Sequence, residues 1–329
     1  MMERMDYVRA ILGDAYAAAA QHEEAEVFMP SNIALVKYWG KRPGVLNLPL
    51  VSSLSLTLKG YGTKTRLSLS HEDSMLLNGK TLSQGDPAYK KAMDFLDMFR
   101  ARGECYRIET ENNIPTAAGV ASSASGFAAL TSAIIKLKGW DVPLKAQSML
   151  ARLGSGSAAR SFWDGMVLWH KGTRDDGMDC YAEPVTHSVH DLCLSVLVLD
   201  ASEKSVSSRD AMQASLATSP MAPEWPQRQA AHLDAALKAA DFATLGQIVE
   251  DNAVLMHAVI QSAVPAMSFD TAETKKWKDN VQRWRTEGMP VYFTQDAGAQ
   301  IKLLYPSAHR ADIEEKINAA GVEYFTVAA

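Results

Sequence analysis

The chain has 329 residues, of which 47% are hydrophobic and 22% are charged, a composition typical of folded enzymes that excludes a mainly disordered protein. Its 33 lysines and arginines against 38 aspartates and glutamates give a net charge of −5. With no run of like charges, this balance argues against nucleic-acid binding. The length exceeds the usual size of one hydrophobic core, so we expect two lobes, residues 1–199 and 200–329, with a cleft between them.

Neither a signal peptide nor a membrane span is expected. Residues 1–21 mix charged with apolar side chains and therefore favour a capping helix over a signal peptide. The longest stretch without charged side chains, Asn112–Ile135, contains proline, glycines and serines that make it too polar for a bilayer. Three cysteines without metal-ligand spacing indicate a reducing compartment. We expect a soluble, cytoplasmic protein.

The first two thirds of the chain mix strands with helices. Alternating apolar and polar residues predict strands at Ser53–Leu58 and Thr63–Leu69, joined as a hairpin by a turn at Lys59–Gly62. Helical spacing predicts helices at residues 87–102, 122–138 and 143–153. Short apolar runs predict strands at residues 106–109, 166–170 and 192–199, of which the last suits a central position.

The last third is mainly helical. Helical periodicity predicts helices at residues 209–216, 226–240, 242–262 and 271–287. Strands at residues 291–294 and 301–305, a helix at 308–320 and a closing strand at 324–327 follow. This arrangement predicts an α+β fold.

A loop of small residues, Asn113–Gly126, leads directly into a predicted helix. Small side chains let backbone N–H groups approach an anion, and the helix N-terminus adds partial positive charge. Phosphate is the natural ligand, although a tightly packed helix start explains the composition equally well. The chain has no Walker A sequence.

A second cluster of glycine and serine, Gly154–Ser161, matches a dinucleotide-binding fingerprint only superficially, because the residues before it favour a helix over a strand. We interpret it as a loop that offers hydroxyl and N–H donors, with Arg160 as a fork for a carboxylate or phosphate. A solvated surface arginine is the alternative.

Two further segments gather cations. Asn32–Arg42 combines three cations with two aromatic residues and fits a polyanionic small ligand, although the edge of an amphipathic strand is the alternative. In Ser205–Arg209, serines can cap the next helix and leave Arg209 facing an anion. Helix capping alone is the simpler interpretation of this second segment.

Asp296 follows a predicted strand and lies on a turn beside Gly298. That position suits a general base held rigidly over a bound substrate. An aspartate in a glycine turn is, however, more often only a turn residue.

Together these segments resemble the GHMP kinase superfamily, and within it the diphosphomevalonate decarboxylase family, over most of the chain. Asn32–Arg42 is similar to the family sequence Asn-Ile-Ala-x-x-Lys-Tyr-Trp-Gly-Lys-Arg, and Asn113–Gly126 is similar to its phosphate loop. Gly154–Ser161 and Asp296–Gly298 match its Gly-Ser-Gly-Ser-Ala-x-Arg-Ser and Asp-Ala-Gly sequences. Four long motifs in the family's order are far more specific than any single glycine-rich loop.

The resemblance implies a GHMP kinase fold, with an N-terminal lobe like domain 2 of ribosomal protein S5, a C-terminal α/β sandwich lobe and a cleft between them. It also implies ATP-dependent decarboxylation of mevalonate 5-diphosphate to isopentenyl diphosphate, ADP, phosphate and CO2. ATP and Mg²⁺ are the implied cofactors, and a homodimer is the implied assembly.

The resemblance further assigns roles to residues. Asp296 would orient or deprotonate the C3 hydroxyl, Lys37 would keep that carboxylate ionised, and Arg160 would hold the C1 carboxylate. The substrate would be positioned by Tyr38, Lys41, Ser155, Gly156, Ser157, Ser208 and Arg209. ATP would be bound by Pro115, Ala118, Gly119, Ala121, Ser122 and Ser123, with Ser122 also beside Mg²⁺.

The chain departs from the family at two places. Ala299-Gln300 stands where the family usually has Pro-Asn, and Val264–Met267 replaces its Pro-Pro-Ile.

Three alternatives remain. The monophosphate could be the substrate, although Lys41 and Arg209 supply cations for two phosphoryl groups. Phosphorylation of the 3-hydroxyl of mevalonate without decarboxylation is disfavoured by the presence of both Lys37 and Asp296. A nucleotide-binding regulator without activity is disfavoured by intact Asp296 and Arg160.

Overall fold

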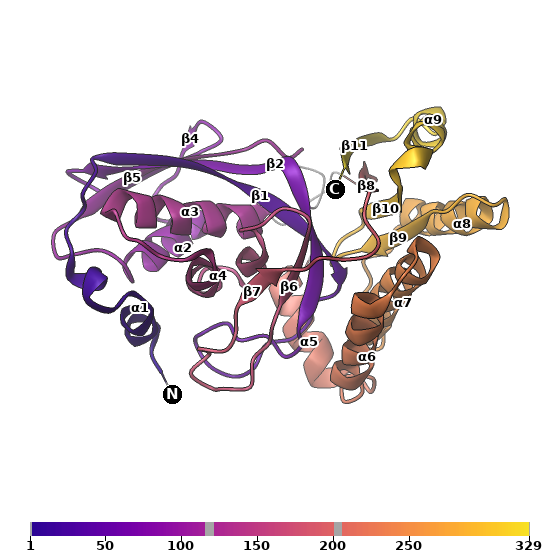
Figure 1. The fold of residues 1–329 in the computed structure, drawn as a ribbon, viewed down its shortest axis with the longest axis horizontal. Coiled ribbons are helices and arrows are strands. Elements are labelled where there is room, and N and C mark those ends of the chain that lie inside the picture. Colours follow the sequence, from indigo (N-terminus) through magenta and orange to yellow (C-terminus); the bar gives the residue numbers. More distant parts are fainter. Residues whose placement is uncertain (1, 116–121, 201–205, 329) are drawn as a thin grey trace.

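The computed structural model describes residues 2–115, 122–200 and 206–328. Its strands form two sheets in different halves of the molecule (Figure 1). The seven-stranded sheet contains β1 (Glu24–Val36), β2 (Ser53–Ser70), β3 (Ser74–Leu77), β4 (Lys80–Thr81), β5 (Cys105–Asn112), β6 (Met166–Trp169) and β7 (Ala182–Pro184). The four-stranded sheet contains β8 (Leu192–Val198), β9 (Tyr292–Gln295), β10 (Ile301–Pro306) and β11 (Glu323–Ala328).

The helices of the first half are α1 (Arg4–Leu12), α2 (Pro87–Leu96), α3 (Ser122–Lys138) and α4 (Leu144–Ala151), with the short 3₁₀ helices η1 (Gly13–Ala17) and η3 (Gly156–Arg160). Those of the second half are α5 (Ser208–Thr218), α6 (Trp225–Lys238), α7 (Phe242–Gln261), α8 (Ala272–Thr286), η4 (Ser307–His309) and α9 (Arg310–Ala319). Among the described residues, no helix combines the length and the apolar character that a membrane span requires.

Each sheet has its own strand order and its own covering helices. The larger sheet runs β4-β3-β5-β2-β6-β7, with β1 paired to β2, and the smaller runs β11-β8-β10-β9. Helix α3 packs on β1 and β2, whereas α7 and α8 pack on β9 and β10 (Figure 1). Each sheet therefore buries one face under helices of its own half.

Most elements lie where the sequence predicts them. Helix α3 begins and ends at the predicted residues, and the helices α5 to α8 differ from prediction only at their ends. The prediction of a central strand at residues 192–199 is confirmed, because β8 pairs with both β10 and β11. β8 precedes residue 200, so the four-stranded sheet takes one strand from residues 1–199. The division into lobes at residues 199 and 200 stays a prediction.

The predicted hairpin over residues 53–69 is wrong, because these residues form the single strand β2. The first part of β2 pairs with β6, the second part pairs with β5, and β1 runs along both parts. The register between β1 and β2 shifts after Pro30, leaving residues 59–61 unpaired with β1, and Gly60 has a φ of +83°. Gly60 therefore allows a bulge where we expected a chain reversal.

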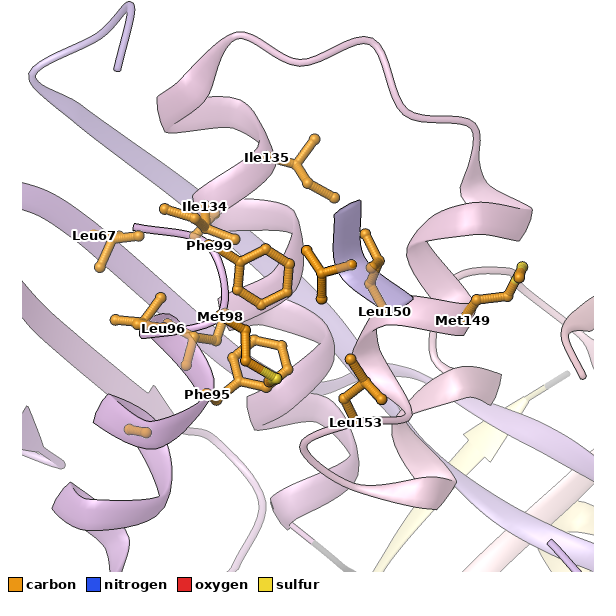
Figure 2. Close-up of a cluster of buried hydrophobic side chains, with 14 of the residues drawn as sticks. Leu67, Phe95, Leu96, Met98, Phe99, Ile134, Ile135, Met149, Leu150 and Leu153 are labelled. Carbon is orange, nitrogen blue, oxygen red and sulfur yellow. The ribbon is translucent and has the colours of Figure 1, made fainter. Parts of the chain in front are cut away.

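The core of the first half lies between α2, α3 and α4 (Figure 2). Phe95 and Phe99, whose ring centroids are 5.0 Å apart, face Ile134 of α3 and Leu150 of α4 across this space. Phe95 and Leu153 also line a cavity of about 520 Å³. The packing of this core therefore fixes one wall of the cavity.

Candidate active site

A cavity of about 520 Å³ takes its lining from both halves of the chain. All ten residues predicted to be catalytic or to position the substrate line this cavity: Lys37, Tyr38, Lys41, Ser155, Gly156, Ser157, Arg160, Ser208, Arg209 and Asp296. They come from segments up to 259 residues apart in sequence, as the contact between Lys37 and Asp296 illustrates. The fold thus brings the four sequence motifs to one place.

Asp296 follows β9 and is held between two lysines that are each 1% exposed. Its Oδ1 lies 2.7 Å from Lys37 Nζ, and its Oδ2 lies 3.2 Å from Lys302 Nζ. Burial opposes ionisation of the carboxyl, but the ammonium groups of Lys302 and Lys37 outweigh burial and hold the pKa of Asp296 well below its usual range. The carboxylate is therefore ionised at neutral pH, and its side chain, 31% exposed, faces the cavity.

Lys37 lies directly after β1, and its backbone is fixed by two helices. Its N–H donates to Asn252 Oδ1 of α7 at 2.7 Å, and its carbonyl accepts from Gln229 Nε2 of α6 at 3.1 Å. Its ammonium group also donates to the carbonyl of Ala34 at 2.9 Å. Burial lowers the pKa of Lys37 to about 8, and the nearby Asp296 carboxylate limits the decrease. Lys37 is thus a cation at neutral pH.

Lys302 is a member of this centre that sequence reasoning missed. It lies in β10 and pairs with Thr294 of β9, and Thr294 is two residues before Asp296 in the sequence. The sequence does carry one signal, because Lys302 is the only charged residue in the apolar run Ile301–Tyr305. A buried lysine is rare without a partner of opposite charge. We call Lys37, Asp296 and Lys302 the acid–lysine centre.

His257 of α7 was also missed, and it supports the turn that carries Asp296. Its buried Nε2 lies 3.2 Å from the backbone carbonyl of Asp296 and must be the donor, because a carbonyl only accepts. Burial lowers the pKa of His257, so the imidazole is neutral. Gln295 Nε2 donates to the carbonyl of Gly298 at 3.0 Å and fixes the other side of the turn.

Arg160 is 3% exposed, which excludes the alternative of a solvated surface arginine. Its Nε donates to Asn32 Oδ1 at 3.1 Å, and its Nη1 donates to Ser53 Oγ at 2.7 Å. Burial lowers the pKa of Arg160 to about 10, which still leaves the guanidinium protonated at neutral pH. Because Asn32 and Ser53 are both neutral acceptors, the positive charge of Arg160 remains available to an anion in the cavity.

Glycine and serine bring the two loops of the site into contact. A Cβ on Gly156 would meet the Tyr38 hydroxyl at 2.8 Å, so this close approach requires glycine. Ser155 Oγ lies 3.3 Å from both Ser123 Oγ and Ser157 Oγ. The Tyr38 hydroxyl is buried and has no hydrogen-bond partner in the described part of the chain. These hydroxyls therefore form a set of donors along one wall of the cavity.

A second group of charges lies where the loop after β1 meets α5. Lys41 Nζ donates to Asn47 Oδ1 at 2.8 Å, and Arg209 is the second residue of α5. Burial, followed by the charges of Arg209 and Arg4, lowers the pKa of Lys41 to about 8. Arg4 of α1 also lines the cavity, although no sequence motif predicts this. We call Arg4, Lys41 and Arg209 the cationic end.

The predicted helix cap before Arg209 is confirmed. Ser207 Oγ accepts from the N–H of Asp210 at 3.1 Å and caps α5, so Ser208 and Arg209 lie in its first turn. Both line the cavity.

The residues predicted to bind ATP are placed only in part. Ser122 and Ser123 are exposed at the start of α3, but only Ser123 lines the cavity; Pro115 is half-buried and does not line it. Ala118, Gly119 and Ala121 lie outside the described residues. A serine hydroxyl at a helix start is an oxygen ligand of the kind that Mg²⁺ accepts beside nucleotide phosphates, so Ser122 fits the predicted role.

The departure at Ala299-Gln300 has a structural role. Gln300 Oε1 accepts from the N–H of Leu199 at 2.6 Å, and its Nε2 donates to the carbonyl of Asp200 at 2.5 Å. The carbonyl of Ala299 accepts from Thr274 Oγ1 at 2.8 Å. These bonds tie the turn after Asp296 to the end of β8 and to α8.

Family models of known proteins match two parts of the chain that together cover most of it. Residues 29–182 match the family model of the diphosphomevalonate decarboxylase-like N-terminal domain, and residues 194–324 match that of the mevalonate 5-diphosphate decarboxylase C-terminal domain. A diphosphomevalonate decarboxylase of Candida albicans is 35% identical over 87% of this chain and 85% of its own length.

Solved structures give the same result. MDDEF in complex with MVAPP, AMPPCP and magnesium has a TM-score of 0.86 at 34% identity, over 93% of this chain and 97% of that one. Mevalonate diphosphate decarboxylase from Staphylococcus aureus has a TM-score of 0.86 at 32% identity, over 93% of this chain and 96% of that one. The predicted α+β, GHMP kinase fold is confirmed, and the chain belongs to the diphosphomevalonate decarboxylase family.

Proposed function

We propose that this protein catalyses the ATP-dependent decarboxylation of mevalonate 5-diphosphate to isopentenyl diphosphate, ADP, phosphate and CO2. The observation that carries the proposal is the position of Asp296, which is ionised between Lys37 and Lys302 in the cavity that also holds Arg160 and the cationic end. A base, a carboxylate-binding arginine and a separate group of cations match the three functional parts of such a substrate. Family membership supports the same activity.

In the first step, the C3 hydroxyl is converted into a leaving group. A tertiary hydroxyl leaves poorly, and transfer of the γ-phosphoryl group of ATP to its oxygen removes that obstacle. Asp296 accepts or orients the hydroxyl proton, and Lys37 stabilises the charge on the reacting oxygens. The ionised state that this role requires is held by both lysines of the centre.

In the second step, the phosphorylated intermediate fragments. The C3–O bond breaks with its electrons on the departing phosphate, and the electrons of the C1–C2 bond form the C2=C3 double bond as CO2 leaves. Arg160, fixed by Asn32 and Ser53, holds the C1 carboxylate in place before this step. The diphosphate of the substrate binds at the cationic end.

We assign ATP to the start of α3, where Ser122 and Ser123 are exposed. MDDEF binds AMPPCP and magnesium together with MVAPP, and this supports ATP and Mg²⁺ as the cofactors of this chain. When bound, Mg²⁺ neutralises phosphate charge. Ser123, through its contact with Ser155, joins this position to the loop that carries Arg160.

The test is an ADP-release assay with mevalonate, its 5-phosphate and its 5-diphosphate, with CO2 measured in parallel. We expect equal amounts of ADP and CO2 from the 5-diphosphate, and a kcat/KM for this substrate that exceeds the kcat/KM for the 5-phosphate. Preference for the 5-phosphate would make the protein a phosphomevalonate decarboxylase. ADP without CO2 from mevalonate would make it a 3-kinase, and no turnover of any substrate would favour a nucleotide-binding regulator.

A homodimer and a cytoplasmic location complete the proposal. Both rest on the family resemblance, and the second also on the cysteine content. Light scattering of the purified protein measures the first, and fractionation of the source cells measures the second.

A further inference from the structure

Helix α1 precedes the part of the chain that the family models match, which begins at residue 29. It is nevertheless firmly attached to the first half. Tyr7 and Val8 are fully buried, and the Tyr7 hydroxyl accepts from Arg152 Nη2 at 2.7 Å and donates to the carbonyl of Gly177 at 3.1 Å. The first residue of this helix, Arg4, therefore has a defined position.

That position is on the wall of the proposed active site. Arg4 lines the same cavity as Lys41 and Arg209, and its charge contributes to lowering the pKa of Lys41. Its Nε donates to the carbonyl of Val45 at 2.8 Å, and its two Nη groups have no hydrogen-bond partner among the residues that the structure describes. Among the described residues, no carboxylate forms an ion pair with any of these three cations.

Three like charges beside one another repel, which raises the energy of the site while it is empty. A bound anion attracts all three cations, and this attraction favours binding. A terminal diphosphate carries more negative charge than a monophosphate and reaches further, so it gains more from a third cation. A guanidinium also binds phosphoryl oxygens through parallel N–H donors, which suits the free Nη groups of Arg4.

We propose that Arg4 is a third diphosphate-binding cation, supplied by an N-terminal helix outside the matched family region, and that it increases the preference for a diphosphate over a monophosphate. This inference rests on the proposed function, which it deepens by naming a residue that sets substrate choice. Arg4 does not take part in bond breaking, so its effect belongs to binding.

Because Arg4 also holds the loop at Val45, the test must separate charge from support. Arg4→Gln keeps a hydrogen-bond donor and removes the charge, whereas Arg4→Lys keeps both a donor and the charge. Arg9→Gln is the matched control, because Arg9 lies in the same helix, is exposed, pairs with Asp6 at 3.6 Å and does not line the cavity. Melting temperatures of the three variants check that α1 stays in place.

The main measurement is calorimetric binding of inorganic pyrophosphate and inorganic phosphate, which needs no turnover. Arg4→Gln is expected to weaken pyrophosphate binding about tenfold and phosphate binding about twofold, and Arg4→Lys and Arg9→Gln are expected to change either by less than about threefold. The loss for pyrophosphate should shrink in high salt. In turnover, Arg4→Gln should lower the ratio of kcat/KM for the 5-diphosphate to that for the 5-phosphate by a similar factor.

Equal losses for pyrophosphate and phosphate, or equal losses in Arg4→Gln and Arg4→Lys, would overturn the inference and leave Arg4 as a support of the loop. Failure of the proposed function is a different result, in which the wild-type protein turns over no mevalonate derivative. The pyrophosphate experiment would still decide the role of Arg4 in that case.

Discussion

The acid–lysine centre and the cationic end lie in one cavity and differ in how their charges are balanced. At the centre, two lysines that are each 1% exposed donate to the two oxygens of one carboxylate. At the cationic end, three cations face the cavity without a carboxylate partner among the described residues. In the first group one carboxylate offsets one of two positive charges within the protein, whereas in the second all three positive charges are left for a ligand to neutralise.

This difference indicates what each group contributes. Charges that are already paired need no reorganisation when the reaction begins, so the centre is suited to lowering the barrier of the chemical step. Charges that repel one another until an anion arrives are suited to substrate binding. Substitutions at the centre should therefore lower kcat, and those at the cationic end should raise KM for the diphosphate.

The largest effect is expected for Asp296→Asn, which removes the carboxylate charge and keeps its shape. We expect kcat to fall by about three powers of ten or more, whereas the dissociation constant for mevalonate 5-diphosphate changes little. Single-turnover CO2 release and calorimetry measure the two quantities. Near-normal CO2 release from the folded variant would remove Asp296 from the mechanism.

Lys302→Met tests whether both lysines are needed to keep Asp296 ionised. The pKa of Asp296 lies below its ordinary value of about 4 because Lys302 and Lys37 oppose the effect of burial. Losing Lys302 raises that pKa, so the acid limb of the kcat profile should move to higher pH, and kcat on that limb should fall by about ten- to a hundredfold, with less change at pH 7.

Lys302→Arg is the control for this change, since it keeps the charge and should restore most of the acid limb. A lower kcat with an unchanged acid limb in Lys302→Met would indicate that Lys302 only fills space in β10. A raised KM with unchanged kcat would contradict the distinction between the two groups of charges.

Arg209→Ala makes the same test at the cationic end. Loss of a charge-assisted hydrogen bond is expected to lower kcat/KM for the 5-diphosphate by about tenfold or more, through KM. The 5-phosphate should lose less, because it lacks the second anionic group. If kcat/KM falls by the same factor for both substrates, Arg209 supports the structure of α5 and does not set the choice of substrate. The assignment of the diphosphate as substrate then loses its main support.

Sequence reasoning found the parts of the site that lie in continuous motifs. Close backbone approach and helix starts impose small residues in a row, which is why Gly154–Ser161 and the segment before α3 could be recognised. Lys302 and His257 reach Asp296 through strand pairing and helix packing, and no local pattern specifies those contacts. For the same reason, Gly60 looked like part of a turn until its neighbours in β1 were known.

The smallest expected effect is the change of kcat and KM at alkaline pH. It arises because burial lowers the pKa of Lys37 and of Lys41 to about 8. A lysine is a cation below its pKa, so both contributions should be lost as pH rises through about 8. Loss of the Lys37 charge should lower kcat, whereas loss of the Lys41 charge should raise KM for the diphosphate, by about three- to tenfold between pH 7 and pH 9.

The variant Lys41→Arg separates the contribution of Lys41 from that of Lys37, since arginine stays protonated throughout this range. In that variant KM should become nearly independent of pH, and the decline of kcat should remain as in the wild type. Steady-state kinetics from pH 6 to pH 10 measures both. If KM keeps its alkaline rise in Lys41→Arg, another group at the cationic end is titrating, and the charge of Lys41 does not control binding.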